Sequence, residues 1–354
     1  MPYKKVKRGN SKMRSLSTNK LKHLEKLSNK KGVIAAAAMD QRGSLQKSIA
    51  KEKGCDVAAV TPEMMAEFKT VVSKVLTPYA TAILLDPEFG LEAAKQRASN
   101  AGLLLAYEST GYEQNTPGRV PRLVPDWTVS KSIAAGANAI KILLYYSPFE
   151  NPKINEIKHA WVERIGAECA LHDIPFFLEF VGYPTAEGQD EKGLDYARKK
   201  PEIVRGSMEE FSKDRYRVDV LKVEIPINLK FVAGTKACKG DSAYSQKEAM
   251  ELYRSTATAT KKPFIYLSAG VSDDEFRESL ELAIESGVKF NGVLCGRATW
   301  KEGIPIYAKS GVKALEDWLS DRGVQNIRAL NAVLDKGATP WYEAFGGLKN
   351  VKVA

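Results

Sequence analysis

The chain has 354 residues, of which 44% are hydrophobic and 27% are charged. This composition is typical of a folded globular protein and excludes a disordered, collagen-like or coiled-coil chain. The length allows two ordinary domains or one large barrel. The net charge is +10, but residues 1–31 hold eleven Lys and Arg and a single acid, Glu25. The rest of the chain is balanced, so the basic charge says little about the partners of the globular body.

The four cysteines are far apart in the sequence and form no CxxC pair. This fits a reducing, cytoplasmic location. No apolar run approaches the 18 or more residues of a membrane span. The basic arm followed by apolar residues 33–39 resembles a signal peptide, but the apolar stretch fits a buried strand better. We therefore expect a cytoplasmic protein that does not bind membranes.

Short apolar runs bounded by turn residues recur along the chain and predict buried strands of a parallel sheet. The segments between them carry apolar residues at helical spacing. Eight such units favour a (β/α)8 TIM barrel over a doubly wound sheet, which would have about five or six strands and a GxGxxG loop that is absent here. The predicted strands are residues 33–40, 82–87, 102–108, 139–146, 175–180, 220–226, 264–270 and 292–298.

The helices expected outside the regular pattern complete the domain organisation. We predict a helix over 18–27 that closes the barrel bottom, a short helix over 91–98, an insertion within 181–219 that carries a helix over 208–213, and extra terminal helices over 312–319 and 324–334. The chain then divides into a basic, disordered arm (1–17), a single barrel (18–342) and a C-terminal tail (343–354). The sequence leaves open whether the tail folds over the active site.

Active sites of such barrels lie at the carboxyl ends of the strands, so polar residues there are the candidates. Nearly every predicted strand supplies one. In chain order they are Asp40, Asp86, Glu108, Lys141, Glu179, Lys222 with Glu224, Ser268 and Arg297.

Lys222 and Glu224 are two residues apart, so both point to one side of their strand, which should be the barrel interior. Burial beside other cations favours the neutral form of a lysine amine, and a neutral amine is a nucleophile toward carbonyl carbon. The alternative is a buried lysine–carboxylate pair that only holds the barrel together. The spacing does not decide between the two.

Lys141 and Glu179 are the next candidates at the strand ends. Lys141 could favour the neutral amine of Lys222 and bind an anion, or it could pair with Glu179 or Asp40 as part of the structure. Glu179 lies in an apolar run, which favours the protonated carboxyl and suits it to proton transfer. A purely structural carboxylate is the alternative.

The last two strands end in small residues that let backbone amides approach an anion, at the position where these barrels often bind phosphate. Ser268 and Gly270 follow the seventh strand, and Gly296 and Arg297 follow the eighth. The Arg297 guanidinium suits phosphate oxygens. The three histidines lie away from strand ends, so the sequence offers neither a zinc site nor a Ser-His-Asp triad, and we predict no metal and no cofactor.

Several motifs together make the chain closely resemble the class I tagatose-1,6-bisphosphate aldolases, over about residues 21–342. The motifs are 39–44 (MDQRGS), 85–90 (LDPEFG), 221–226 (LKVEIP), 266–271 (YLSAGV) and 294–300 (LCGRATW). The resemblance implies a barrel that reversibly cleaves D-tagatose 1,6-bisphosphate to glycerone phosphate and D-glyceraldehyde 3-phosphate through a lysine Schiff base, without a metal.

The resemblance also implies roles for individual residues. It makes Lys222 the Schiff-base lysine and assigns catalytic functions to Glu179, Asp40 and Lys141, with Glu224 as a further candidate. Phosphate binding falls on Ser268 and Arg297, flanked by Gly270 and Gly296. Gln41 and Arg42 are candidates for the other phosphate.

Other functions remain open at this point. A sibling aldolase for fructose 1,6-bisphosphate or a sulfonated sugar phosphate would share these motifs. A regulator that binds sugar phosphates without turnover, with its arm on nucleic acid or an acidic partner, is the alternative from another class. We expect a small-molecule sugar bisphosphate as partner rather than nucleic acid, and a homo-oligomer, dimer or larger.

Overall fold

The computed structural model describes residues 15–109, 117–186 and 188–353. Eight parallel strands form a closed barrel in sequence order, with the first strand paired to the last. This confirms the predicted (β/α)8 barrel and all eight strands. The barrel strands are β2 (Ile34–Ala38), β3 (Ala82–Leu85), β4 (Gly102–Ala106), β5 (Ala139–Tyr145), β6 (Phe176–Val181), β7 (Val220–Glu224), β8 (Phe264–Leu267) and β9 (Gly292–Cys295).

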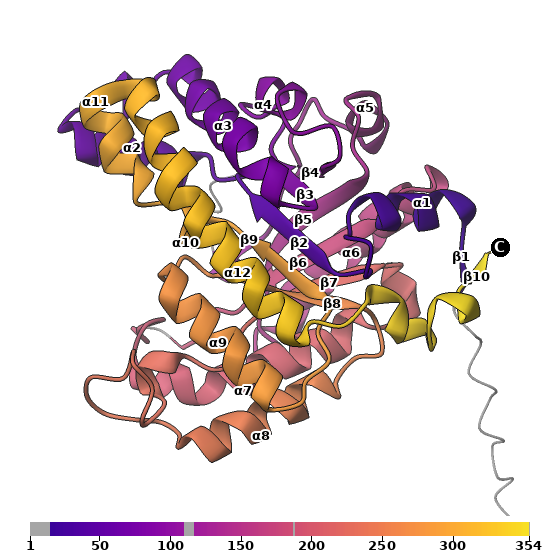
Figure 1. The fold of residues 1–354 in the computed structure, drawn as a ribbon. Helices are drawn as coiled ribbons and strands as arrows, with labels where there is room; N and C mark the ends of the chain where they lie inside the picture. The colour runs from indigo at the N-terminus through magenta and orange to yellow at the C-terminus, as the bar shows by residue number, and fades with distance from the viewer. Residues whose placement is uncertain (1–14, 110–116, 187, 354) are drawn as a thin grey trace, which may run out of the picture.

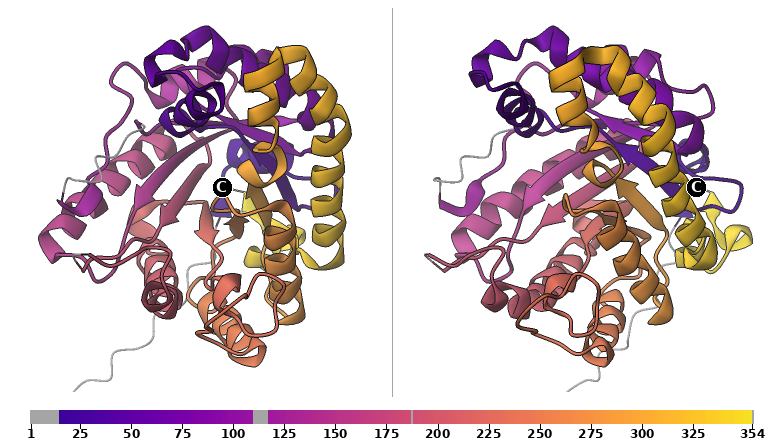
Figure 2. Two further views of the ribbon diagram at one scale, coloured as in Figure 1. Left: turned by 90° about the vertical axis from the view of Figure 1, so that its left-hand side faces the viewer. Right: turned by 60° about the vertical axis from the view of Figure 1, so that its left-hand side comes forward.

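Helices surround this barrel, as the two views in Figure 2 show from different sides. They are α2 (Gly43–Lys53), α3 (Pro62–Leu76), α4 (Leu91–Lys95), α5 (Val129–Ala134), α6 (Pro152–Leu171), α7 (Leu194–Phe211), α8 (Gln246–Ala257), α9 (Asp273–Glu285), α10 (Arg297–Trp300), α11 (Gly303–Trp318) and α12 (Val324–Gly337). The last two are joined by a short π-helical segment, Leu319–Gly323.

Two helix predictions differ from the structure. The expected insertion with a helix over 208–213 is instead the long helix α7, which covers the barrel like its neighbours. The first part of α7 was not predicted. It contains Pro201, and proline normally ends or kinks a helix. The helix expected over 312–319 begins earlier, at Gly303, and has a kink at Gly311 with a φ of 77°.

Alternation along the strands separates two hydrophobic cores. Ile34, Ala36 and Ala38 of β2 belong to the cluster that fills the barrel, together with Phe177 of β6. Residues of opposite parity, such as Ala37, pack outward against the helices. The small side chains of β2 leave room for Phe177, so the lower part of the barrel is solid.

The ends of the chain close the barrel at the amino ends of its strands. Helix α1 (Thr18–Lys26) lies beside the C-terminal segment at this end (Figure 1), which confirms the helix predicted for the bottom. Leu24 of α1, Trp341 of the 3-10 helix Trp341–Phe345 and Val351 of the tail join the interior cluster. The tail therefore covers the bottom of the barrel and not the carboxyl ends of the strands.

The boundary of the basic arm also differs from the prediction. Residues 15–16 form the short strand β1 (Ser15–Leu16), which pairs in parallel with β10 (Lys352–Val353). The predicted disorder of residues 1–14 lies outside the described residues. In the described parts of the chain, no helix is both long and apolar enough to cross a membrane.

Candidate active site

A cavity of about 700 Å³ opens at the carboxyl ends of the strands. It brings together nine of the eleven residues predicted for the site: Asp40, Gln41, Arg42, Glu179, Lys222, Ser268, Gly270, Gly296 and Arg297. Lys141 does not line this cavity, but its ammonium group contacts the lining residues Asp40, Glu108 and Glu179. The remaining lining includes Ser44, Lys47, Glu108, Ser109 and Tyr145.

Lys222 and Glu179 lie side by side on adjacent strands of the barrel. The register of β6 and β7 places them directly opposite each other, and both face the interior. The ammonium nitrogen of Lys222 lies 2.9 Å from Oε2 of Glu179, and the side chain of Lys222 is only 4% exposed. The barrel thus holds one lysine amine against one carboxylate at the base of an open cavity.

Lys141 is shared by three carboxylates from three different strand ends. Its ammonium nitrogen lies 2.8 Å from Asp40, from Glu108 and from Glu179. Burial would lower the pKa of Lys141, but Asp40, Glu108 and Glu179 outweigh it and raise the pKa well above its usual value. Lys141 is therefore a permanent cation, and the ion pairs considered from the sequence are present.

Burial raises the pKa of Asp40 and of Glu108, but the charged neighbours of these two acids lead to opposite results. For Asp40, the charges of Lys141 and Lys222 outweigh burial, so its pKa lies below the usual value. For Glu108, burial prevails over Lys141 and Arg42, and its pKa is raised. Asp40 is consequently the more strongly ionised of the two acids.

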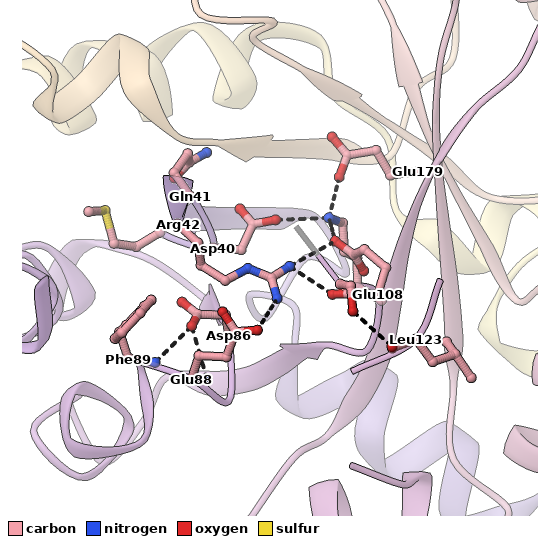
Figure 3. Close-up of polar contacts among 12 residues, drawn as sticks. Asp40, Gln41, Arg42, Asp86, Glu88, Phe89, Glu108, Leu123 and Glu179 are labelled. Carbon is pink, nitrogen blue, oxygen red and sulfur yellow. Dashed lines mark hydrogen bonds and ion pairs between the residues drawn. The ribbon is translucent and has the colours of Figure 1, made fainter. Parts of the chain in front are cut away.

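Arg42 is buried and engaged with protein groups (Figure 3). Its guanidinium donates to the carbonyl oxygen of Glu108 at 2.7 Å and to the carboxylate of Glu88 at 3.4 Å. These contacts hold the loop after β2 against the ends of β3 and β4. Both terminal nitrogens of Arg42 therefore bind protein oxygens, while its buried Nε has no hydrogen-bond partner among the described residues.

The turn after β8 and the start of α10 form a cradle around Arg297. The turn is closed by a hydrogen bond from the Val271 amide to the Ser268 carbonyl, at 3.1 Å. Ala269 and Gly270 both have positive φ, 48° and 80°. A Cβ on Gly270 would lie 2.7 Å from Cζ of Arg297, so this position needs glycine for two reasons. The guanidinium lies close to the turn and lines the cavity, in a position that suits an anion.

Glu224 lies outside both the cavity lining and the group of carboxylates around Lys141. Its Oε2 accepts a hydrogen bond from the Gly182 amide at 2.7 Å, and its Oε1 lies 3.2 Å from the ammonium of Lys200. It therefore ties α7 and the end of β6 to β7. These contacts hold neighbouring elements together, and the side chain predicted as a further catalytic candidate does not line the cavity.

The site also contains residues for which the sequence predicts no role. Glu108 and Asp86 can be recognised in the sequence as polar residues at strand ends, but the sequence motifs give them no function. Lys69 comes from α3 and was missed. Its signal was its place on the apolar face of that helix, four residues after Met65 and three before Val72.

A parallel barrel with a buried lysine at its open end, paired with a carboxylate and facing an arginine cradle, has the architecture of an enzyme that acts on anionic carbonyl compounds. Comparison with known families makes this specific. The family described as DeoC/LacD family aldolase matches residues 34–302. The chain belongs to this aldolase family.

Curated relatives cover almost the whole chain. It is 47% identical to a tagatose 1,6-diphosphate aldolase of Listeria monocytogenes, over 96% of this chain and 99% of the relative. It is 50% identical to tagatose 1,6-diphosphate aldolase 2 of Enterococcus faecalis, over 93% and 98%. A third relative, tagatose 1,6-diphosphate aldolase 2 of Streptococcus mutans, is 46% identical over 93% and 98%.

Solved structures share the fold at low sequence identity. A fructose-bisphosphate aldolase of Plasmodium falciparum superposes with a TM-score of 0.64 at 13% identity, covering 92% of this chain and 98% of the other. A Schiff-base-forming fructose-1,6-bisphosphate aldolase superposes with a TM-score of 0.53 at 14% identity, covering 88% and 98%. At this identity the likeness concerns the barrel alone.

Proposed function

We propose that this chain is a class I aldolase that reversibly cleaves D-tagatose 1,6-bisphosphate to glycerone phosphate and D-glyceraldehyde 3-phosphate. The observation that carries the proposal is the buried amine of Lys222 at the base of the cavity, 2.9 Å from Glu179. The names of the curated relatives support the choice of sugar. No metal or cofactor is part of the proposed reaction.

In the first half of the reaction, Lys222 attacks the ketose carbonyl carbon C2. The carbinolamine then loses its hydroxyl as water and becomes a protonated imine on Nζ. Glu179 is placed to accept the proton that the attacking amine releases and to return a proton to the departing hydroxyl. One carboxylate can perform both transfers because it contacts the nitrogen directly.

In the second half, the bond between C3 and C4 breaks. Its electron pair moves into the imine and gives an enamine on Lys222, while the C4 hydroxyl loses its proton and becomes the aldehyde of glyceraldehyde 3-phosphate. Glu179 takes this proton. Protonation of the enamine at C3 and hydrolysis of the imine then release glycerone phosphate and restore the amine.

Lys141 and Asp40 keep charge fixed around the reacting atoms. Lys141 stays cationic with its ammonium group on Asp40, Glu108 and Glu179, while the ionised Asp40 stabilises the positive charge of the imine. Gln41 adds a polar group at the cavity wall. Its buried Oε1 has no hydrogen-bond partner among the described residues, which suits it to a substrate hydroxyl.

The cavity lining offers anion-binding groups for both phosphates. Ser268, Gly270, Gly296 and Arg297 would hold one of them in the cradle after β8. The other fits Lys47 and Ser44 in the first turns of α2, where no side chain caps the helix and the amide groups favour an anion. Binding both phosphates of the substrate would hold C2 and C4 beside Lys222 and Glu179. Less entropy is then lost on reaching the transition state, which lowers the activation free energy.

Cleavage rates test the choice of sugar. The purified protein is assayed with EDTA present, on tagatose 1,6-bisphosphate, fructose 1,6-bisphosphate and a sulfonated sugar phosphate, by coupled oxidation or reduction of the triose products. We expect the highest kcat/KM on the tagatose sugar. A clear preference for either of the other substrates would replace it in the proposal.

We also propose a cytoplasmic homodimer or larger assembly. The four cysteines form no disulfide, which supports a reducing location. Two large apolar side chains, Phe149 shortly before α6 and Ile157 in the second turn of α6, are more than half exposed, which supports a subunit contact there. Sedimentation should show an oligomer that Ile157→Lys weakens, and a monomer at all concentrations would contradict the assembly.

A further inference from the structure

Lys69 is a fully buried lysine outside the cavity lining, on the inner face of α3. Its ammonium group contacts the carboxylate of Asp86 and donates to the backbone carbonyl oxygens of Met39 at 2.8 Å and Gln41 at 2.7 Å. An ammonium group has three N–H donors. All three therefore have a partner, and two of them are directed at main-chain oxygens.

These two carbonyl groups belong to the residues directly before and after Asp40. The backbone leading into this segment is fixed as well, since the Met39 amide donates to the Leu84 carbonyl at 2.7 Å and the Trp300 indole donates to the Ala38 carbonyl at 2.9 Å. Lys69 thus holds the segment 39–41, which follows β2 and contains Asp40.

Asp86 in turn holds Lys69 in place. It follows β3 directly, and its Oδ1 accepts hydrogen bonds from the amides of Glu88 at 3.1 Å and Phe89 at 2.8 Å. Figure 3 shows Asp86 beside Glu88 and Phe89, on the far side of Arg42 from Glu108. A lysine needed only to neutralise Asp86 would not have to reach both carbonyl groups that flank a site carboxylate.

The charge of Lys69 acts on the same residue. Burial lowers the pKa of Lys69, and Asp86 and Asp40 oppose this effect. Reciprocally, Lys69 is one of three lysines, after Lys141 and Lys222, that lower the pKa of Asp40 against its burial. The contacts of Lys69 and its charge both favour an ionised Asp40 held on Lys141.

We infer that Lys69 is a positioning residue of the aldolase site, which holds the backbone on both sides of Asp40 so that the Asp40 carboxylate stays on Lys141. Lys69 touches no reacting atom, and it acts through Asp40. The inference rests on the proposed function, because it assigns a part in the same reaction.

Two variants and a control on the same helix test the inference. Lys69→Met removes the donors and keeps the length of the side chain, and Lys69→Met/Asp86→Asn also avoids leaving a buried carboxylate without its partner. Lys74→Met removes a solvent-exposed lysine of α3. We expect kcat to fall by about 10- to 100-fold in both Lys69 variants with little change in KM, because a small misplacement of a site group has effects of this size. Lys74→Met should behave like the wild type.

A double-mutant cycle separates positioning from general support of the fold. Asp40→Asn is combined with Lys69→Met/Asp86→Asn, and kcat is measured for each protein after its melting temperature confirms folding. If Lys69 acts through Asp40, the combined loss is smaller than the product of the separate losses. Multiplicative losses, or an unchanged kcat in the Lys69 variants, would overturn the inference.

Crystal structures of the same proteins give a readout that does not depend on activity. We expect the 2.8 Å ion pair between Asp40 and Lys141 to be broken or lengthened in the Lys69 variants and kept in Lys74→Met. An intact ion pair in the Lys69 variants would refute the positioning role. A wild type that cleaves no sugar bisphosphate, together with a broken ion pair in the variants, would refute the proposed function and leave the effect of Lys69 on Asp40 standing.

Discussion

Individual charges in this site are shared and not simply paired. Oε2 of Glu179 lies close to two ammonium groups, at 2.8 Å from Lys141 and 2.9 Å from Lys222. When Lys222 is neutral or bonded to substrate, Lys141 still compensates the carboxylate. Glu179 can therefore change its partner during the reaction without becoming a buried, uncompensated charge.

This arrangement makes Glu179 the residue whose chemistry is hardest to replace. Glu179→Gln keeps the shape but cannot accept a proton, so kcat should fall by about 10²- to 10⁴-fold. Glu224→Gln is the matched control, since Glu224 binds the Gly182 amide and Lys200 outside the cavity lining. Steady-state kinetics should show most of the activity retained in that control. Equal losses in the two variants would contradict the assignment of proton transfer to Glu179.

The lowered pKa of Asp40 makes a prediction about stability. A carboxylate whose pKa is lower in the folded state than its usual 3.8 contributes stability that is present above that value and is lost as the pH falls through the folded value. Asp40→Asn lacks this group. The free energy of unfolding should therefore fall less steeply in Asp40→Asn than in the wild type as the pH drops below about 4.

Urea unfolding at a series of pH values measures this difference. Asp335→Asn serves as the control, because Asp335 is largely exposed in its pair with Lys31 and exposed pairs contribute little. Its curve should run parallel to that of the wild type. A parallel curve for Asp40→Asn as well would show that Asp40 is not held ionised by its neighbours.

At the scale of elements, the turn between β8 and α9 is shaped to receive the guanidinium of Arg297. Ala269 lies in the left-handed region, where a residue with a Cβ costs about 1–2 kcal/mol. Lys301 adds a hydrogen bond from its ammonium to the Gly270 carbonyl at 3.1 Å. The strained turn is held in place from outside, as expected where backbone strain serves a binding site.

Gly270→Ala tests this turn against a matched glycine. Both Gly270 and Gly287 have positive φ, 80° and 74°, but only a Cβ at 270 meets Arg297, while one at 287 meets nothing within 4 Å. Both alanine variants should lose about 1–2 kcal/mol of unfolding free energy. Only Gly270→Ala should also raise KM for the sugar bisphosphate, by about tenfold for a binding loss of about 1.4 kcal/mol. Equal KM values for the two variants would remove the turn from the phosphate site.

At the scale of the whole molecule, the two ends of the barrel have separate tasks. The carboxyl ends of the strands carry the charged site, while the amino ends are sealed by α1 and by Trp341, which is only 1% exposed. The first and last described residues meet there through β1 and β10. Stability and chemistry should therefore respond to different substitutions.

Trp341→Ala tests this division of the barrel. The loss of a fully buried tryptophan should cost about 3–5 kcal/mol of unfolding free energy, with KM unchanged for the folded enzyme. Leu348→Ala, at a half-exposed position of the same tail, should change stability by at most about 0.5 kcal/mol. Denaturant unfolding and kinetics on the same samples measure both effects. A raised KM in Trp341→Ala would mean that the closed bottom of the barrel influences the site.

The sequence predicts the barrel well because each buried parallel strand is a short apolar run with a polar residue at its end. That pattern locates Lys222, Glu179 and Arg297 without any contact information. It does not locate Lys69, because this lysine reaches the site from a helix, and its burial is explained only by oxygens of residues far away in the chain. For Glu224 the strand pattern predicts too much. Its position on β7 is equivalent to that of Lys222, but its partners are Lys200 on α7 and the Gly182 amide after β6.

Schiff-base formation on Lys222 is the step on which the proposed mechanism depends, and it can be trapped by reduction. The full-length protein is incubated with glycerone phosphate and EDTA, reduced with borohydride, digested, and analysed by peptide mass spectrometry. The Schiff-base mechanism predicts one reduced adduct, on Lys222, and none in Lys222→Met. A folded protein that binds glycerone phosphate but gives no adduct, or an adduct on another lysine, would contradict it.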